Sequence, residues 1–298
     1  MKKMFLVSLA LFLAALAAVF VGCAHKSSSS GSSDHGASPA DDDDNDDQDN
    51  TIPPDQAFLP PPPAGKMWTM IWHDEFDGTE LDTSKWTTYG SEASPEPHRD
   101  GYWVKEATYL DGQGHLVVET YEKDGKYYDG CVDTSQSFTH TTGYYETKMK
   151  CHTQVGHWIA YWMDGGDQSQ ANPAKGEEID IIEKAWVQGL MAGWIQETLH
   201  WGGGGWDEKN YWAPQALDGY HTYGLYWTDT SYTFYFDGVA VWTPKKSDGI
   251  CGVPLPMIIS DEIGNEFFDN GTIEQATLPD YSYFDYVRVF DLIDKTRD

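Results

Sequence analysis

Hydrophobic and polar residues alternate with a period of two along most of the chain after residue 67. Such alternation, in segments rich in aromatic and β-branched residues, predicts β-strands. Asp-Gly pairs, which favour tight turns, recur between these segments. We find no long amphipathic helix and no internal repeat. The segments predicted as strands are 115–121, 144–152, 156–163, 177–185, 222–228, 231–237, 257–263 and 283–291.

The predicted strands are numerous and short, and they extend over one continuous region, 67–298. A region of this length with this pattern is typical of a single all-β domain, either a sandwich or a jelly roll. We therefore expect an all-β fold with one hydrophobic core for residues 67–298.

The first 22 residues are typical of an export signal. Lys2 and Lys3 precede an apolar run, 4–21, which ends at Gly22-Cys23. Small residues before a single cysteine resemble a bacterial lipoprotein signal, which implies lipidation of Cys23 and a membrane partner. Plain secretion is one alternative, and an uncleaved anchor is another, since about 17–20 apolar residues can span a bilayer. We expect a lipid-anchored protein of the bacterial cell envelope, at the outer membrane or cell surface, or a secreted one.

Residues 23–66 are rich first in serine, then in aspartate at 41–50, and then in proline at 60–63. Such a segment buries too little apolar area to offset the entropy lost on ordering. We predict a disordered tether between the signal and the domain 67–298. The aspartate run could bind cations, but a solvated spacer is the simpler interpretation.

Charge and cysteine content narrow the possible partners. Acidic residues outnumber basic residues by 48 to 19, for a formal net charge of −29. A nucleic-acid-binding protein needs a basic surface, so we expect no nucleic-acid partner. Outside the cytosol a disulfide is permitted among Cys131, Cys151 and Cys251, but the sequence does not decide which pair.

Three acidic residues are grouped in the segment 178–183, EIDIIE. On a strand, Glu178 and Asp180 point the same way, whereas Glu183 would fall on the opposite face. A one-residue bulge at 181–182 returns it to the same face. Two glutamates leaning together from such a strand can reach the carboxyl separation of retaining glycosidases, about 5–5.5 Å. A solvated acidic strand is the alternative, but crowding like charges is unfavourable unless a site uses them.

This motif and its flanks resemble glycoside hydrolase family 16, the family of laminarinases and β-glucanases, in its bulged E-x-D-x-x-E branch. The resemblance implies a β-jelly roll of the concanavalin A-like kind, with two curved antiparallel sheets and a cleft on the concave face. The similar segments are 72–86 (WHDEFDGTELDTSKW), 141–150 (TTGYYETKMK), 156–163 (GHWIAYWM), 176–183 (GEEIDIIE), 197–201 (ETLHW), 221–238 (HTYGLYWTDTSYTFYFDG) and 284–290 (FDYVRVF).

Carried over residue by residue, the resemblance assigns the catalytic roles. It implies that Glu178 is the nucleophile, that Glu183 is the general acid/base, and that Asp180 modulates their protonation. One carboxylate must be ionised to attack the anomeric carbon while the other keeps its proton. Glu177 falls on the opposite strand face, and we expect it at the surface.

The resemblance also implies substrate-binding residues. Trp158 and Trp162 share one strand face and would floor the cleft, although packing in the core is the alternative for both. His200 would lie close to the acid/base, with a structural role as its alternative, and Trp201 would extend the binding site. The four glycines 202–205 predict a mobile loop at the cleft rim.

A structural calcium ion is common in the family on the convex side. The matching positions are Glu75, the carbonyl of Gly114, and Asp285. Oxygen ligands from separate segments suit Ca²⁺, with ordinary surface acids as the alternative. We expect that catalysis itself requires no cofactor.

The acidity of the domain bears on the substrate, because a sulfated polyanion would be repelled. We expect an endo-acting, retaining hydrolase that acts as a monomer on a neutral β-1,3-glucan or mixed β-1,3-1,4-glucan. The alternatives are an agarase- or porphyranase-type β-galactanase of the same family and a non-catalytic, lectin-like lipoprotein that binds glycans.

Overall fold

The computed structural model describes residues 58–169, 171–246, 248–264 and 271–295, all within one compact unit, Asp49–Asp298. The predicted export signal, the lipidation site Cys23 and most of the tether lie outside these residues. Within the described part of the chain, no helix has the length and apolar character needed to cross a membrane.

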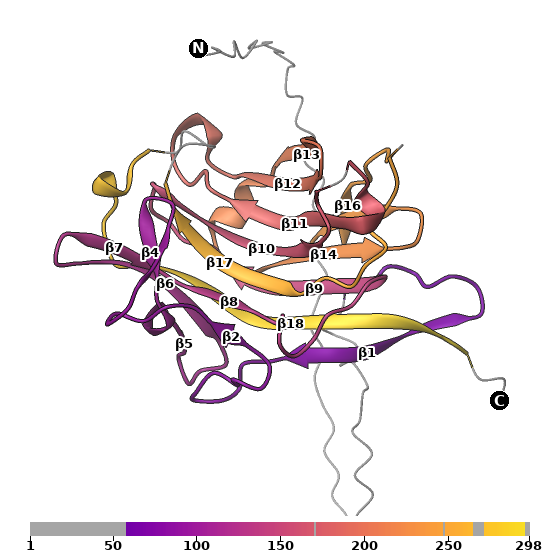
Figure 1. Cartoon of the computed structure of the whole chain (residues 1–298), viewed down its shortest axis with the longest axis horizontal. Coiled ribbons are helices and arrows are strands. Elements are labelled where there is room, and N and C mark those ends of the chain that lie inside the picture. The colour runs from indigo at the N-terminus through magenta and orange to yellow at the C-terminus, as the bar shows by residue number, and fades with distance from the viewer. Residues whose placement is uncertain (1–57, 170, 247, 265–270, 296–298) are drawn as a thin grey trace, which may run out of the picture. The chain divides into compact units, whose positions relative to one another are not determined.

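The described strands form two sheets that face each other (Figure 1). The first contains β1 (Lys66–Asp74), β3 (Glu96–His98), β4 (Gly101–Trp103), β5 (Thr108–Leu110), β6 (Leu116–Lys123), β7 (Lys126–Asp129), β9 (Gly143–Lys150), β14 (His221–Trp227), β15 (Tyr232–Phe236), β16 (Val239–Trp242) and β18 (Asp280–Asp294). The second contains β2 (Thr87–Thr88), β8 (Cys131–Asp133), β10 (His157–Gly166), β11 (Gly176–Lys184), β12 (Trp194–Trp201), β13 (Gly205–Trp212) and β17 (Met257–Ile263).

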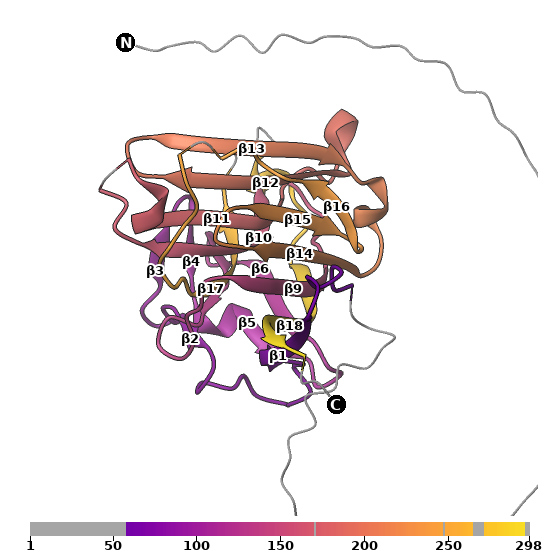
Figure 2. The ribbon, with the colours of Figure 1, turned by 90° about the vertical axis from the view of Figure 1, so that its right-hand side faces the viewer.

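The second sheet carries the grouped acids, and its strand order is β13-β12-β11-β10-β17-β8-β2. Figure 2 shows β13, β12, β11 and β10 side by side, with β13 outermost. In the first sheet the order is β16-β15-β14-β9-β18-β6-β7-β4-β3, with β1 paired to β18 and β5 to β6. Nearly all pairs are antiparallel, β4 with β7 being parallel. Short 3₁₀ turns occur at Lys105–Ala107, Pro173–Lys175, Gly189–Met191, Pro214–Leu217 and Ile273–Gln275.

The prediction of an all-β fold of two curved antiparallel sheets is confirmed, and each predicted strand segment coincides with an observed strand. The strands β1–β5, β7, β8, β12, β13 and β16 were not among the predicted segments. Strand β13, GWDEKNYW, lies at the edge of its sheet and carries both polar and aromatic residues on each face, so it lacks the alternation that marks a half-buried strand.

Alternating side chains fill the core between the sheets. On β10, Ile159, Tyr161 and Met163 are buried in the main hydrophobic cluster, which sends Trp158 and Trp162 to the other face. The cysteines Cys131, Cys151 and Cys251 are buried free thiols, so no disulfide links these three. A closely packed apolar core therefore holds the sheets together in this part of the chain.

Candidate active site

The catalytic-strand prediction depends on a bulge in β11, and the strand register contains it. Against β12, Asp180 pairs with Thr198 and Glu183 pairs with Gln196, so three steps on β11 match two on β12. The pairing of β11 with its other neighbour, β10, shows the same extra residue on β11. The predicted bulge is confirmed, and it returns Glu183 to the face of Glu178 and Asp180.

Core packing holds this bulge in place. Ile181 is 1% exposed and Ile182 is 0% exposed, and both join the main hydrophobic cluster with Ile179. Burying a side chain of this size contributes about 1.5–3 kcal/mol. Since both bulge residues point into the core, the carboxylates on either side are left on the outer face of the sheet.

Glu178 and Glu183 border a cleft of about 310 Å³, and Asp180 is buried between them. The neighbouring strand β12 contributes His200, whose Nε2 lies 3.6 Å from Glu178 Oε1 and 3.7 Å from Asp180 Oδ2. The side chains that line the cleft are Arg99, Trp158, Glu178, Glu183, Gln196, Thr198, His200, Trp206 and Glu208.

Hydrogen bonds from β12 fix the carboxyl of Glu183. The hydroxyl of Thr198 donates to Glu183 Oε2 at 2.8 Å. The side-chain amide of Gln196 donates to the Thr198 hydroxyl at 3.0 Å and to Glu183 Oε2 at 3.4 Å. Glu183 is thereby held in one orientation at the base of the cleft.

The environment raises the pKa of both glutamates. Burial raises the pKa of Glu178 to about 7, and the negative charges of Asp164 and Glu262 add to the rise. Burial likewise raises the pKa of Glu183 to about 7, against the lowering effect of the Thr198 hydrogen bond. Near neutral pH, such groups exchange a proton readily and suit acid–base chemistry.

Asp180 lies between these glutamates and is almost fully buried. Burial raises its pKa well above the usual value, and the charges of Glu183 and Glu178 raise it further. Asp180 is therefore the group that keeps a proton when its neighbours ionise.

A hairpin between β3 and β4 brings one cation to the cleft. Arg99, at the tip of this hairpin with φ 48°, is paired with Glu262 of β17. Its guanidinium carbon lies 5.0 Å from the ring centroid of Trp158. Of the lysines and arginines in the described segments, Arg99 is the one that lines the cleft, and its charge lowers the pKa of both glutamates.

Of the sequence-predicted substrate residues, Trp158 and His200 line the cleft, and Trp162 and Trp201 do not. Trp158 lines the cleft but is only 2% exposed, with Arg99 above its ring. Trp162 shares its strand face, is half-buried, and donates its indole N–H to Ser260 at 3.0 Å. His200 lines the cleft, whereas Trp201 does not, because it points to the opposite face and packs against the core cluster.

The prediction that Glu177 lies at the surface is wrong. It is 0% exposed, accepts the Tyr232 hydroxyl at 2.6 Å, and pairs with Lys246 at 2.5 Å. The Lys246 ammonium also lies 3.6 Å from the centroid of the Trp201 ring. Tyr232 and Lys246 come from distant parts of the chain, so the local alternation of β11 could not show that this face is enclosed.

Sequence analysis missed several residues of the cleft. Arg99 could not be found, because only the hairpin position brings it to the site. Thr198 had a weak signal, since it is two residues from His200 on a strand and must share its face. The missed side chains are Arg99, Gln196, Thr198, Trp206 and Glu208.

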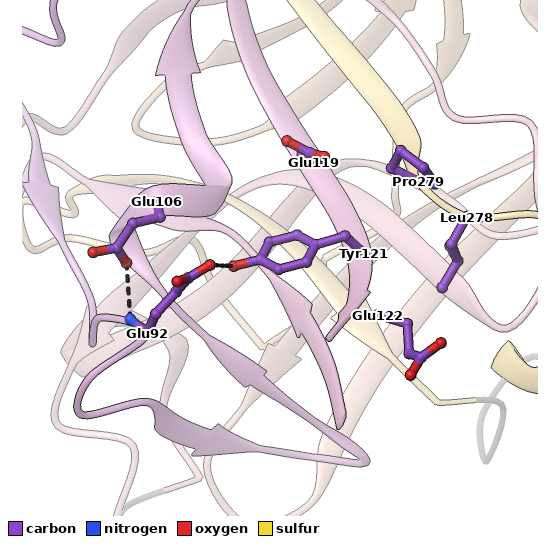
Figure 3. Close-up of a pocket in the computed structure, with 7 residues that line it drawn as sticks. All are labelled: Glu92, Glu106, Glu119, Tyr121, Glu122, Leu278 and Pro279. Atoms are coloured by element: carbon purple, nitrogen blue, oxygen red, sulfur yellow. Dashed lines mark hydrogen bonds between the residues drawn. The ribbon is translucent and has the colours of Figure 1, made fainter. Parts of the chain in front are cut away.

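A second acidic cavity lies elsewhere, beside β6 and the segment before β18, with a volume of about 350 Å³ (Figure 3). Its carboxylates do not converge on one point. Glu92 accepts the hydroxyl of Tyr121 at 2.8 Å, and Glu106 accepts the backbone N–H of Glu92 at 2.9 Å. This cavity lacks the carboxyl groups on one face of a single strand that distinguish the cleft on β11.

The residues predicted to hold calcium do not fit the ion as placed. Glu75, Gly114 and Asp285 border one cavity of about 320 Å³. However, Glu75 accepts two N–H groups of Arg288, at 2.8 and 2.6 Å, and Asp285 pairs with Lys148 at 2.5 Å. Although burial opposes it, hydrogen bonds from His73 and Arg288 lower the pKa of Glu75 to about 2. Cations of the chain itself thus neutralise both carboxylates.

Two other groups of side chains have a spacing that a metal would accept. Glu178, Asp180 and His200 form one, within the cleft itself. The other contains His152, His157 and Asp280, in which the carboxylate already accepts the backbone N–H groups of two neighbouring residues at 2.8 and 2.6 Å. Because that carboxylate is already hydrogen-bonded, the buried group is explained as a structural network.

Comparison with known proteins gives one family. The model described as glycosyl hydrolases family 16 matches residues 97–281. The chain is 25% identical over 272 residues to glucan endo-1,3-beta-glucosidase A1 of Niallia circulans, a match that covers 74% of this chain and 37% of that protein. It is 27% identical over 254 residues to beta-porphyranase E of Zobellia galactanivorans, covering 74% and 86% of the two chains. The chain thus spans little more than a third of the first relative.

Solved structures show the same fold. The endo-beta-1,3-glucanase from Pyrococcus furiosus superposes with a TM-score of 0.65 at 23% identity, covering 78% of this chain and 97% of that one. The laminarinase from Flavobacterium sp. UMI-01 gives a TM-score of 0.62 at 23% identity, covering 74% and 100%. At these identities the likeness concerns the jelly-roll fold.

Proposed function

The chain belongs to glycosyl hydrolases family 16, and we propose that it cleaves neutral β-1,3- or mixed β-1,3-1,4-glucans internally, with retention of configuration. The observation that carries this proposal is the bulge in β11, which sets Glu178, Asp180 and Glu183 on one face beside the cleft. Double displacement uses two carboxyl groups at one cleft, one as nucleophile and one as acid/base, and this arrangement supports the proposal.

We assign the roles in the order of the motif. Glu178, ionised, attacks the anomeric carbon and forms a covalent glycosyl ester, while Glu183 donates its proton to the leaving oxygen. Glu183 then removes a proton from the incoming water, which cleaves the ester and releases Glu178. Asp180, neutral because of its burial, can donate a hydrogen bond to either glutamate and limits the repulsion between them.

The charge of the cleft favours a neutral substrate. Of the carboxyl groups that border or adjoin it, Asp180 and Glu183 hold protons before the reaction, whereas Glu178 and Glu208 supply negative charge. The positive charge of Arg99 is balanced by Glu262. A sulfated sugar would therefore enter a negative field in which the arginine among the described cleft residues is already paired, whereas uncharged hydroxyl groups can donate to the carboxylates.

A β-galactanase of the agarase or porphyranase type is the second candidate. It is favoured by the match to beta-porphyranase E, which covers 86% of that relative. The two candidates differ in the sugar they cleave, so a digest of laminarin, mixed-linkage glucan, agarose and carrageenan separates them. We expect oligosaccharides of mixed length from laminarin or mixed-linkage glucan. Products from agarose or carrageenan alone contradict the glucanase proposal, and binding without products supports a lectin-like role.

The hydrogen bond from Thr198 predicts a pH effect. Because it lowers the pKa of Glu183, the Thr198→Val variant should raise that pKa. The acid is active when protonated, so a higher pKa keeps it active to higher pH. We expect the basic limb of kcat/KM to move upward by up to about one pH unit. The measurement is the pH profile with laminarin, and Thr198→Ser, which keeps the hydroxyl, is the control. If the basic limb of the profile stays in place or moves to lower pH, the assignment of Glu183 as the general acid is wrong.

A further inference from the structure

The edge strand β13 continues the rows of side chains that begin at the catalytic strand. Glu178 pairs with His200 on β12, and His200 pairs with Trp206 on β13. Two further rows run parallel to it, from Asp180 through Thr198 to Glu208 and from Glu183 through Gln196 to Asn210. Because paired residues point to the same side of a sheet, Trp206 lies on the face that carries the carboxylates.

The spacing of the strands places Trp206 at the distance of a remote sugar. Neighbouring strands lie about 4.8 Å apart, so two steps put the Cα of Trp206 roughly 10 Å from that of Glu178. A glycan bound at Glu178 and directed across the strands therefore reaches Trp206 within a few sugar units. Strand β13 is the outermost strand of this sheet (Figure 2), so a bound glycan that continues past Trp206 leaves the sheet at its edge.

Among the tryptophans that line the cleft in the described structure, Trp206 has the accessible ring. It is 58% exposed, whereas Trp158 is 2% exposed and has the Arg99 guanidinium above its ring. An indole bound to a sugar must offer a free face, because the C–H groups of the sugar pack flat against it. Trp206 meets this condition better than Trp158.

The segment 201–206, WGGGGW, explains how this indole is presented. Gly203 and Gly204 have φ of 79° and 75°, conformations that favour glycine, so they turn β12 into β13. A Cβ on Gly205 would lie 2.0 Å from Trp201 Nε1, so the Trp201 ring packs directly against this glycine. Trp201 therefore supports the turn, and the turn sets Trp206 opposite His200.

We propose that Trp206 is a substrate-binding residue that stacks against a sugar remote from the bond being cleaved, on the β13 side of the cleft. The ligand is a neutral polysaccharide chain, and the proposal rests on the proposed function for the identity of that chain. Glu208, two residues along the same strand and also lining the cleft, is placed to accept hydroxyl groups of the same sugar or its neighbour.

The chain offers a matched control, because Trp212 lies on the same strand and the same face. It is 64% exposed, and it does not line the cleft. We compare Trp206→Ala, Trp206→Phe and Trp212→Ala on laminari-oligosaccharides of increasing length. We expect Trp206→Ala to lose about tenfold or more in kcat/KM on long chains, mainly through KM, with little change on the shortest cleaved chain. Trp206→Phe should recover most of this loss, and Trp212→Ala should resemble the unmodified protein.

Affinity for a long oligosaccharide, measured by calorimetry, separates this inference from the proposed function. Binding that weakens in Trp206→Ala but not in Trp212→Ala supports the inference even if the protein cleaves nothing, in which case only the proposed function fails. Unchanged affinity and unchanged KM on long chains in Trp206→Ala overturn the inference. A loss of equal size on short and long chains also overturns it, because it shows a local effect at the catalytic carboxylates.

Discussion

Replacement of Glu178 by glutamine is expected to reduce hydrolysis by at least about 10³-fold while the protein still folds and binds glycan. Glutamine has the shape of glutamate but cannot attack the anomeric carbon, so no glycosyl ester forms. The measurement is the release of reducing ends from laminarin, with affinity for an oligosaccharide measured on the same preparation. Loss of hydrolysis with retained affinity separates a chemical role from a binding role.

The same substitution should not lower stability near neutral pH. Burial raises the pKa of Glu178 to about 7 from its ordinary 4.5, so between these values the folded protein holds a proton that the unfolded chain releases. Stability therefore falls as the pH rises through this window, and a neutral glutamine removes that loss. We expect a melting temperature at pH 8 equal to or above that of the unmodified protein.

Glu208 provides the matched control for Glu178→Gln. It lines the same cleft but lies on β13, outside the E-x-D-x-x-E motif. Glu208→Gln should keep most of the hydrolysis, with any loss appearing in KM. Equal losses in the two variants would mean that the cleft responds to its total charge, and the role of Glu178 as nucleophile would then be wrong.

The fold and the carboxylates of β11 could be predicted because the local alternation of apolar and polar residues determines them. The bulge at 181–182 follows from a single mismatch in an otherwise regular alternation, because both isoleucines must be buried and all three acids must avoid the core. The strand faces of Trp158 and Trp162 follow from the same rule. These inferences need only one strand and the requirement that apolar side chains leave water.

The features that could not be predicted depend on contacts between distant segments. Glu177 is buried because Tyr232 and Lys246, 55 and 69 residues away, enclose it. Trp201 and Trp206 are equally aromatic in sequence, and only the pairing of β12 with β13 shows that one packs against the core while the other lines the cleft. Strand β13 carries polar and aromatic residues on both faces, so its alternation in sequence does not show which face meets the cleft.

Removal of the general acid should give a different kinetic signature from removal of the nucleophile. In Glu183→Ala no side chain protonates the leaving oxygen, so we expect a loss of at least about 10²-fold on laminarin. Aryl glycosides with acidic leaving groups need little protonation, so the first step on them should be much less affected. The measurement is kcat/KM for a series of aryl glycosides plotted against leaving-group pKa, which should be steeper in the variant. An unchanged slope contradicts the role of Glu183 as acid.

Azide then tests retention through the configuration of the product. If Glu178 still forms the glycosyl ester in Glu183→Ala, a small anion can enter the space left by the carboxyl and attack the ester without base catalysis. Attack on the ester inverts the anomeric centre a second time, so the product should be a β-glycosyl azide and turnover of an activated glycoside should rise with azide concentration. In Glu178→Ala, where no ester forms, azide attacks the substrate itself and should give the α-azide. An α-azide from the Glu183 variant would show a single displacement, because only one inversion would separate product from substrate, and the double-displacement assignment would then be wrong.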